Sequence, residues 1–182
     1  MNNYKNTLSG CAVLMSAMLL VACNQSSGTQ TSAVDSNQSD AQVAVNKAES
    51  TVALSSSNVS VYSGDTFTLD ITMSKFSTSE GGGVTVRFDP ALLQAMNVSI
   101  NESVWSFKNK EGRINNAEGT ISDILFSSYQ GVSDDASIAT IEFKSISSGV
   151  SSITLAESAE NAFAADGQKI MVAFESTTVT SN

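Results

Sequence analysis

From residue 51 onward, apolar and polar residues alternate along short segments, and this pattern constrains the fold more than any other feature of the chain. Residues 66–73 read Thr-Phe-Thr-Leu-Asp-Ile-Thr-Met, and shorter alternating stretches occupy residues 84–88 and 139–144. A period of two places the apolar side chains on one face of a β-strand. Turn residues recur at a spacing of roughly 8–12 residues, which is typical of a β-sandwich or a barrel. We therefore predict an all-β domain.

Segments 52–61, 121–126, 153–155 and 170–179 complete the predicted strands, the first as either one kinked strand or two short ones. Residues 88–94, Phe-Asp-Pro-Ala-Leu-Leu-Gln, depart from strand character. Asp89 suits a helix N-cap, and Pro90, the only proline, suits the first helical position. Since good helix formers follow, we predict one helical turn near 90–94 that folds Leu92 or Leu93 under one end of the sandwich.

The composition divides the chain near residue 50. Residues 24–50 are mostly Ser, Gln, Asn, Ala, Thr and Asp with scattered valines and no aromatic residue. Such a segment buries too little apolar surface to offset the entropy of ordering it, so we expect a flexible linker, with a short helix over 41–48 as the alternative. Residues 51–182 remain for one domain with one core.

The first 23 residues have the pattern of a secretory signal. Lys5 is the only charge before Asp35, and residues 11–22 are almost wholly small and apolar, too short to span a bilayer. Residues 20–23, Leu-Val-Ala-Cys, resemble the lipobox of bacterial lipoproteins, which implies a signal peptide over 1–22 and lipid attachment at Cys23. The alternative is an ordinary cleaved signal in which this cysteine is incidental.

If Cys23 carries acyl chains, the domain is tethered to a membrane in an extracytoplasmic space, since several chains together anchor stably. In lipoproteins of Gram-negative bacteria, Asp after the lipidated Cys retains the protein in the inner membrane. Residue 24 is Asn, so the resemblance favours the outer membrane if the host is Gram-negative.

Composition also limits the chemistry. Cys11 leaves with the signal and Cys23 carries lipid, so we expect no disulfide, no thiol ligand and no thiol nucleophile. The chain has no histidine, which excludes Ser-His-Asp catalysis and His-ligated zinc. Its formal net charge of −9 opposes binding to nucleic acid. With 18 acidic residues some carboxylate pair is inevitable, so none indicates an enzyme, and we expect no cofactor and no metal.

Five segments resemble the cohesin domain family in order and spacing. Residues 64–71 resemble the strand that opens these domains, and residues 87–93 their Asp-Pro turn. Residues 119–126 are similar to the central strand that begins with Gly, residues 138–144 to the following strand, and residues 162–170 to the loop before the last strand. The resemblance implies a nine-stranded, jelly-roll-like sandwich that binds and does not catalyse, similar in fold to carbohydrate-binding modules.

Cohesins hold the dockerin modules of polysaccharide-degrading enzymes, and the resemblance implies a contact on one sheet face. The polar positions that the best-known members use fall on Gly81 and Gly83 here, so the usual dockerin contact lacks its side chains. By alternation Thr85 and Arg87 remain on that face, and Arg87 is the expected anchor, with a solvated charge as the alternative. An Asp introduced at Gly83 is expected to strengthen recognition unless that glycine has a positive φ.

Two other groups of residues have a possible binding role. Trp105 and Phe107, on one strand face, and the tyrosines Tyr62 and Tyr129 suit either a sugar-stacking platform or packing in the core and rim. Residues 134–135, both Asp, could bind calcium together with Asp123 or Asp166, or form a solvated acidic loop.

Three functions follow as hypotheses. The first is a membrane-anchored, monomeric module that holds a protein partner, dockerin-like or other, in polysaccharide metabolism. The second is a carbohydrate-binding module, and the third a structural lipoprotein of the envelope.

Overall fold

The computed structural model describes residues 50–133 and 135–182. The predicted signal peptide, Cys23 and the linker up to residue 49 lie outside the described residues. The described part has no helix long and apolar enough to cross a membrane. Its thirteen strands are β1 (Ser50–Leu54), β2 (Asn58–Val61), β3 (Thr66–Ser74), β4 (Ser79–Arg87), β5 (Leu93–Ile100), β6 (Phe107–Asn115), β7 (Thr120–Val132), β8 (Ala136–Ser145), β9 (Gly149–Glu157), β10 (Ala164–Ala165), β11 (Gln168–Lys169), β12 (Val172–Phe174) and β13 (Thr177–Ser181).

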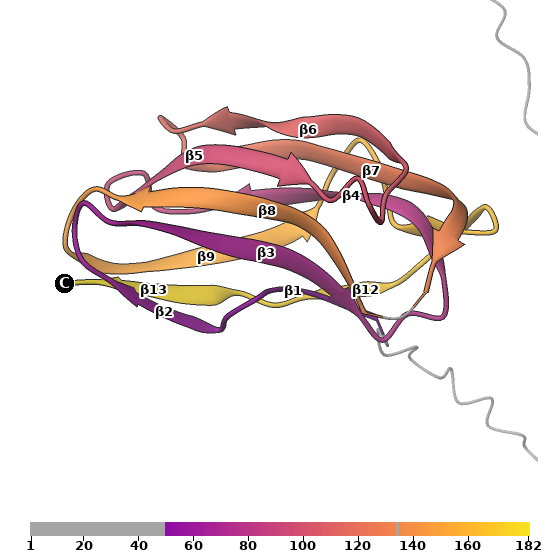
Figure 1. Cartoon of the computed structure of the whole chain (residues 1–182), viewed down its shortest axis with the longest axis horizontal. Coiled ribbons are helices and arrows are strands. Elements are labelled where there is room, and N and C mark those ends of the chain that lie inside the picture. The colour runs from indigo at the N-terminus through magenta and orange to yellow at the C-terminus, as the bar shows by residue number, and fades with distance from the viewer. Residues whose placement is uncertain (1–49, 134) are drawn as a thin grey trace, which may run out of the picture. The chain divides into compact units, whose positions relative to one another are not determined.

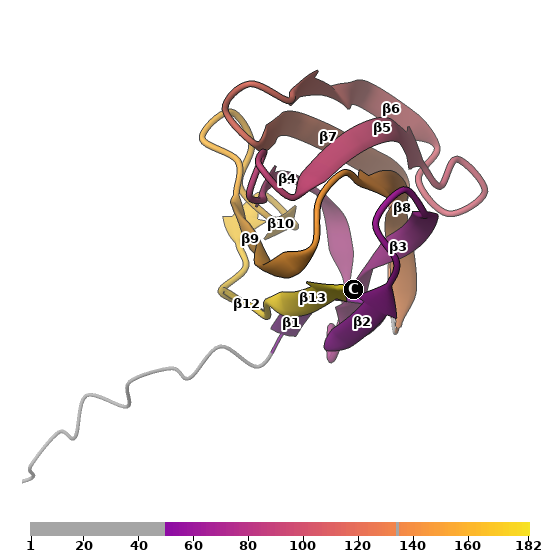
Figure 2. The ribbon, with the colours of Figure 1, turned by 90° about the vertical axis from the view of Figure 1, so that its left-hand side faces the viewer.

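The strands form two sheets that enclose one core (Figures 1 and 2). One sheet has the order β12-β1-β3-β8-β5. The other runs β11-β10-β4-β9-β13-β2, and β7 joins it along the free side of β4 with β6 outside β7. We call this second sheet the β4 sheet. The prediction of an all-β sandwich is confirmed.

The strand count differs from the expected nine because the strands at both ends of the domain change sheets. β1 pairs with β3 in one sheet, whereas β2 pairs with β13 in the other. Between them, the Ser55 N–H donates to Asp70 O (2.8 Å) and Ser57 O accepts from the Thr178 N–H (3.0 Å), so residues 55–57 carry the chain across. The last strand is divided in the same way, because β12 pairs with β1 in one sheet and β13 pairs with β9 in the other. A small hairpin of β10 and β11 adds two further strands.

The core consists of the side chains that the alternating pattern predicted. Leu69, Ile71 and Met73 of β3 are at most 2% exposed, and Ile141 and Phe143 of the paired strand β8 are fully buried. Since alternate side chains of a strand point to opposite faces, the polar residues between them lie on the outer surface. The period-two prediction for both strands is therefore confirmed.

The predicted helical turn near 90–94 does not become a helix. The Asp89 side chain does cap the turn, because its Oδ1 accepts from the Ala91 N–H (2.9 Å), and its carbonyl accepts from the Leu93 N–H (2.9 Å). Leu93 then begins β5 by pairing with Ser145 of β8. Because its backbone enters the sheet, the helical turn cannot continue beyond this residue. Leu93 is 1% exposed, as expected for a residue folded under the sandwich.

Candidate binding face

The outer face of the β4 sheet carries the side chains that the sequence singled out. Val84 and Val86 of β4 are fully buried, so Thr85 and Arg87 point away from the core. Arg87 is exposed and Thr85 is half-buried. The structure thus places both residues on one side of the sheet, two positions apart on its central strand.

Strand pairing aligns further polar residues with Arg87. On one side Arg87 pairs with Thr154 of β9, and on the other with Thr120 of β7, which in turn pairs with Asn115 of β6. Residues directly opposite one another in a ladder share a face of the sheet. A polar row therefore crosses four strands, in the order Asn115, Thr120, Arg87 and Thr154.

A hollow of about 330 Å³ lies beside this row. No aromatic or aliphatic residue lines it; its lining residues are Thr85, Arg87, Arg113, Asn115, Glu118, Thr120 and Ser122. Most of these side chains offer hydrogen-bond donors, through hydroxyl, amide and guanidinium groups. We call the hollow, with the polar row, the open half of the face.

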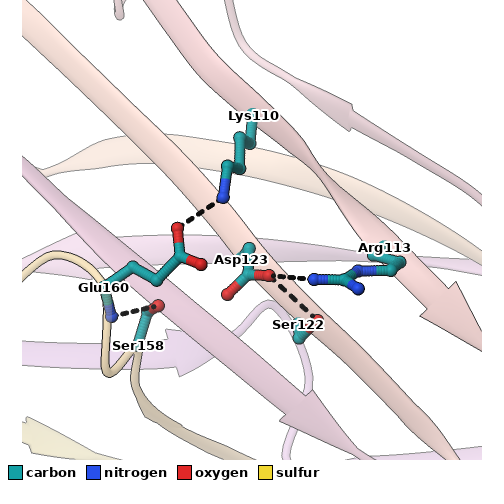
Figure 3. Close-up of polar contacts among 6 residues, drawn as sticks. All are labelled: Lys110, Arg113, Ser122, Asp123, Ser158 and Glu160. Atoms are coloured by element: carbon teal, nitrogen blue, oxygen red, sulfur yellow. Dashed lines mark hydrogen bonds and ion pairs between the residues drawn. The ribbon is translucent and has the colours of Figure 1, made fainter. Parts of the chain in front are cut away.

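A bulge in β7 shapes one wall of the open half. Val84 pairs with Ile124 and Val86 with Ile121, so two β7 residues, Ser122 and Asp123, lie opposite Thr85 alone. Asp123 has a φ of 61°, and its Oδ2 accepts from Arg113 Nη2 (3.0 Å) and from Ser122 Oγ (3.2 Å) (Figure 3). The carboxylate of Asp123 therefore holds Arg113, although the Arg113 side chain remains 76% exposed.

A close approach of backbones positions Thr120. Gly119 has a φ of +64°, and its carbonyl accepts from the Phe88 N–H (2.9 Å). A Cβ at this position would lie 2.1 Å from the Phe88 carbonyl oxygen, so only glycine fits. The Gly that begins the motif of residues 119–126 thus joins the start of β7 to the end of β4, beside the polar row.

In the other half of the face, the loop between β9 and β10, residues 158–163, covers Gly83, and a hollow of about 260 Å³ remains beside Gly81. Gly81, Gly82 and Gly83 of β4 are all buried. The Ser158 N–H donates to Gly83 O (2.8 Å), and Asn161 Nδ2 donates to Gly82 O (3.2 Å). The glycines leave room for this loop to lie directly on β4, so we call the region the covered half.

An ion pair fastens the loop across the sheet. Lys110 of β6 contacts the carboxylate of Glu160, and the two side chains meet above the outer face in Figure 3. The Glu160 N–H donates to Ser158 Oγ (3.2 Å), which orders the loop locally. On the same strand, the pKa of Lys108 is raised because its ammonium group donates to Glu102 and Glu111.

The expectation for Gly83 is wrong. Its φ is not positive, but the outer side is filled: a Cβ would lie 2.7 Å from Leu125 Cδ2, 2.7 Å from Ser158 Cβ and 2.9 Å from Asn161 O. An Asp here has no space and no exposure to a partner. The sequence did contain a signal, because a Gly run in a strand often marks a close approach of another backbone.

Trp105 cannot belong to a sugar-stacking platform, since it is fully buried. Its Nε1 donates to Ser137 O (3.0 Å), and its ring packs edge-on against the ring of Phe126, with the ring centroids 4.5 Å apart. It precedes β6 and does not share a face with Phe107, which is 54% exposed. The alternative of core packing is confirmed for Trp105.

The remaining candidates do not gather at one place. Tyr129 and Tyr62 are 89% and 70% exposed, on β7 and in the β2–β3 turn. Asp123 pairs with Arg113, and Asp166 is exposed in the β10–β11 turn. Residue 134 lies outside the described residues, among which no three His, Cys, Asp or Glu form a group that could hold a metal ion.

Comparison with known proteins gives a family and a fold. The model of the cohesin domain matches residues 50–181. No curated protein matches the chain.

Three solved structures illustrate the likeness. A solution structure of the cohesin CaCohA2 from Clostridium acetobutylicum is 22% identical, with a TM-score of 0.57 over 72% of this chain and 91% of that one. The OlpC cohesin of Clostridium thermocellum, crystallised in a cohesin–dockerin complex, is 15% identical, with a TM-score of 0.59 over 75% and 96%. A non-cellulosomal cohesin of the archaeon Archaeoglobus fulgidus is 15% identical, with a TM-score of 0.58 over 74% and 92%.

At these identities the solved structures establish the fold, and the family model establishes the relationship. Its match begins at the first residue of β1 and ends at the last residue of β13. This chain belongs to the cohesin domain family.

Proposed function

We propose that the chain is a lipid-anchored cohesin module that holds a protein partner at the open half of the β4 sheet. The observation that carries the proposal is the polar hollow beside Arg87, on the sheet face that the resemblance to cohesins implies, in a chain whose cohesin match spans residues 50–181. The dockerin in the complex with the OlpC cohesin supports a dockerin-type partner. The module acts as a non-catalytic monomer, and the partner carries a domain that works on polysaccharide.

The covered half makes the mode of binding differ from the usual one. Side chains at Gly81 and Gly83 are absent; the loop 158–163 occupies the place beside Gly83, and Phe126 and Ser127 of β7 lie against Gly81. The polar side chains that β4 offers a partner on this face are therefore those of Thr85 and Arg87, together with the neighbouring residues of β6 and β7. The area of contact with the partner is therefore expected around Arg87, the last residue of β4.

The test uses the full chain as bait in a pull-down from solubilised envelope, followed by calorimetry against recombinant dockerins. Capture of a dockerin-bearing protein, with saturable 1:1 binding, supports the proposal. Retention on polysaccharide beads without a protein partner favours the carbohydrate-binding alternative, for which Trp105 is no longer available. Capture of envelope components alone favours the structural lipoprotein.

The anchor needs a separate test. Lipidation at Cys23 and residence in the outer membrane are proposed from the lipobox-like residues 20–23 and from Asn24. Cys23→Ser should leave the domain folded, since β1 begins at Ser50, but release it from the membrane fraction. Mutant protein that stays wholly in the membrane fraction would show that another feature anchors the chain.

A further inference from the structure

Arg87 differs from its basic neighbours on the outer face. Lys110 and Arg113 of β6 form ion pairs with Glu160 and Asp123. Lys108 of β6, whose strand partner is the buried Phe126, and Lys169 of β11 form ion pairs as well. In the part of the chain that the structure describes, Arg87 forms no ion pair. Its guanidinium is therefore the cationic group on this face that is free to pair with an outside anion.

The neighbours of Arg87 suit an oxygen-rich anion. Thr120 and Thr154 are its direct partners on the two adjacent strands, and Asn115 continues the row. Hydroxyl and amide groups can donate to a carboxylate that the guanidinium holds, and an arginine fork matches the two carboxylate oxygens. The hollow offers no aromatic ring on which a neutral sugar could stack.

The charge of the whole chain limits the kind of anion. A formal net charge of −9 repels polyanions at long range, so an acidic polysaccharide or a nucleic acid approaches this surface poorly. One carboxylate on a partner that is otherwise neutral or basic avoids that repulsion. Protein side chains supply such isolated carboxylates.

We propose that the open half recognises a carboxylate side chain, Asp or Glu, of the protein partner, with Arg87 as the pairing group and Thr120, Thr154 and Asn115 as neighbouring donors. This inference rests on the proposed function, because it names the chemistry of the partner at the same site. Arg113 lines the hollow beside it but is already neutralised by Asp123.

One acidic residue of the chain opposes the incoming carboxylate. Glu118 lines the hollow from the β6–β7 turn, where its N–H donates to Asn115 Oδ1 (3.3 Å). Its carboxylate makes no ion pair with Arg87 or Arg113 in the described structure. Replacing it should therefore strengthen binding, whereas a merely solvated face would not respond.

The first experiment uses a small probe and does not require the partner. Amide and arginine side-chain NMR signals of the full-length protein in micelles are followed during titration with acetyl-Ala-Glu-Ala-Glu-Ala-amide, or with the same peptide carrying Gln or Lys in place of Glu. We expect the Glu peptide alone to shift the Arg87 Nε–H and the Thr120 and Thr154 amides. Glu118→Gln should lower the half-saturating concentration at least twofold, and Arg87→Gln should abolish the shifts.

The matched control is Lys144→Gln, which removes a cation without an ion pair from β8 of the other sheet and should change nothing. Equal shifts with all three peptides, or none at Arg87, overturn the inference. Retention on immobilised polygalacturonate that Arg87→Gln abolishes also overturns it, in favour of an acidic glycan.

The second experiment separates this inference from the proposed function. With the dockerin that binds tightest, Arg87→Glu should weaken binding at least tenfold, since it sets two like charges opposite each other. If a dockerin binds and Arg87→Glu has no effect, the carboxylate inference fails while the proposed function stands. If no dockerin binds but the Glu peptide shifts the Arg87 signals, the proposed partner is wrong, whereas the carboxylate-binding site at Arg87 is supported.

Discussion

The two halves of the outer face are built on the same strands, yet they rest on different cores and differ in what covers them. Beneath the covered half, the Phe126 ring packs edge-on against Trp105 and Phe163, with centroid distances of 4.5 Å and 5.8 Å. Phe163 belongs to the loop itself and lies against Gly82, where a Cβ would approach its ring to 2.8 Å. Beneath the open half, the buried residues Val84, Val86 and Ile121 are aliphatic.

This difference separates stability from binding within one sheet. The loop 158–163 is part of the core on its inner side, through Phe163, and closes the face on its outer side, through Asn161 and Glu160. Substitutions in the covered half therefore act on folding. Arg113 pairs with the buried Asp123, but substitutions at the other residues of the open half remove polar surface groups, so they act on recognition.

The largest expected effect is at Trp105, beneath the covered half. Trp105→Ala should lower the free energy of unfolding by about 3–5 kcal/mol, because it leaves a cavity beside Phe126 and an unpaired Ser137 carbonyl. Chemical denaturation of the full chain measures this. Tyr129→Ala is the control, since its 89% exposed ring should cost less than about 0.5 kcal/mol. Equal effects would mean that Trp105 is not a core residue.

A second test compares the same change in the two halves. Gly83→Asp should destabilise the domain by about 3 kcal/mol, since the Cβ has no space and the carboxylate is placed against buried groups. Thr85→Asp, two positions along β4 on the same side, should cost less than about 1 kcal/mol, because its side chain is half-buried and lines the hollow. Melting temperatures that fall equally would contradict the division of the face.

The ion pair that fastens the loop should contribute little to global stability. Lys110→Ala should cost about 0–1 kcal/mol, since both side chains of the pair are about half exposed. Locally it should raise amide exchange in residues 158–162 while leaving β3 and β8 unchanged. A loss of several kcal/mol would show that the loop depends on this pair and not on Phe163.

The smallest effect on stability is expected at Arg87. Arg87→Ala should change the free energy of unfolding by less than about 0.5 kcal/mol, because Arg87 is exposed and forms no ion pair in the described residues. Val86→Ala, its neighbour on β4, should cost about 1–3 kcal/mol because that side chain is fully buried. A destabilising Arg87→Ala would make Arg87 a structural residue.

The sequence predicted the parts of this architecture that depend on local pattern. Period-two alternation placed Leu69 and Ile71 inside and Arg87 outside, and the motifs of residues 64–71 and 138–144 indicated the family. The change of sheet at residues 55–57 was foreseen only as a kink, because pairing with β13 brings together residues about 120 positions apart.

The division of the face could not be read from pattern. Lys110 and Glu160 are 50 positions apart, and nothing in either segment indicates that they meet. The bulge at Ser122 and Asp123 has no signature in the alternation of β7, so Arg113 and the hollow were missed. From the sequence Trp105 suited packing in the core or rim better than a platform, and only its full burial and its hydrogen bond to Ser137 O decide for the core.

The most direct test of the account is hydrogen exchange of the backbone amides with and without the partner that the pull-down recovers. The account predicts protection on binding in residues 85–87 and 113–122, together with Thr154, and little change in the loop 158–163 or in β3, β8 and β5. Protection confined to the loop or to the opposite sheet would contradict it, because the partner would then bind a surface other than the open half.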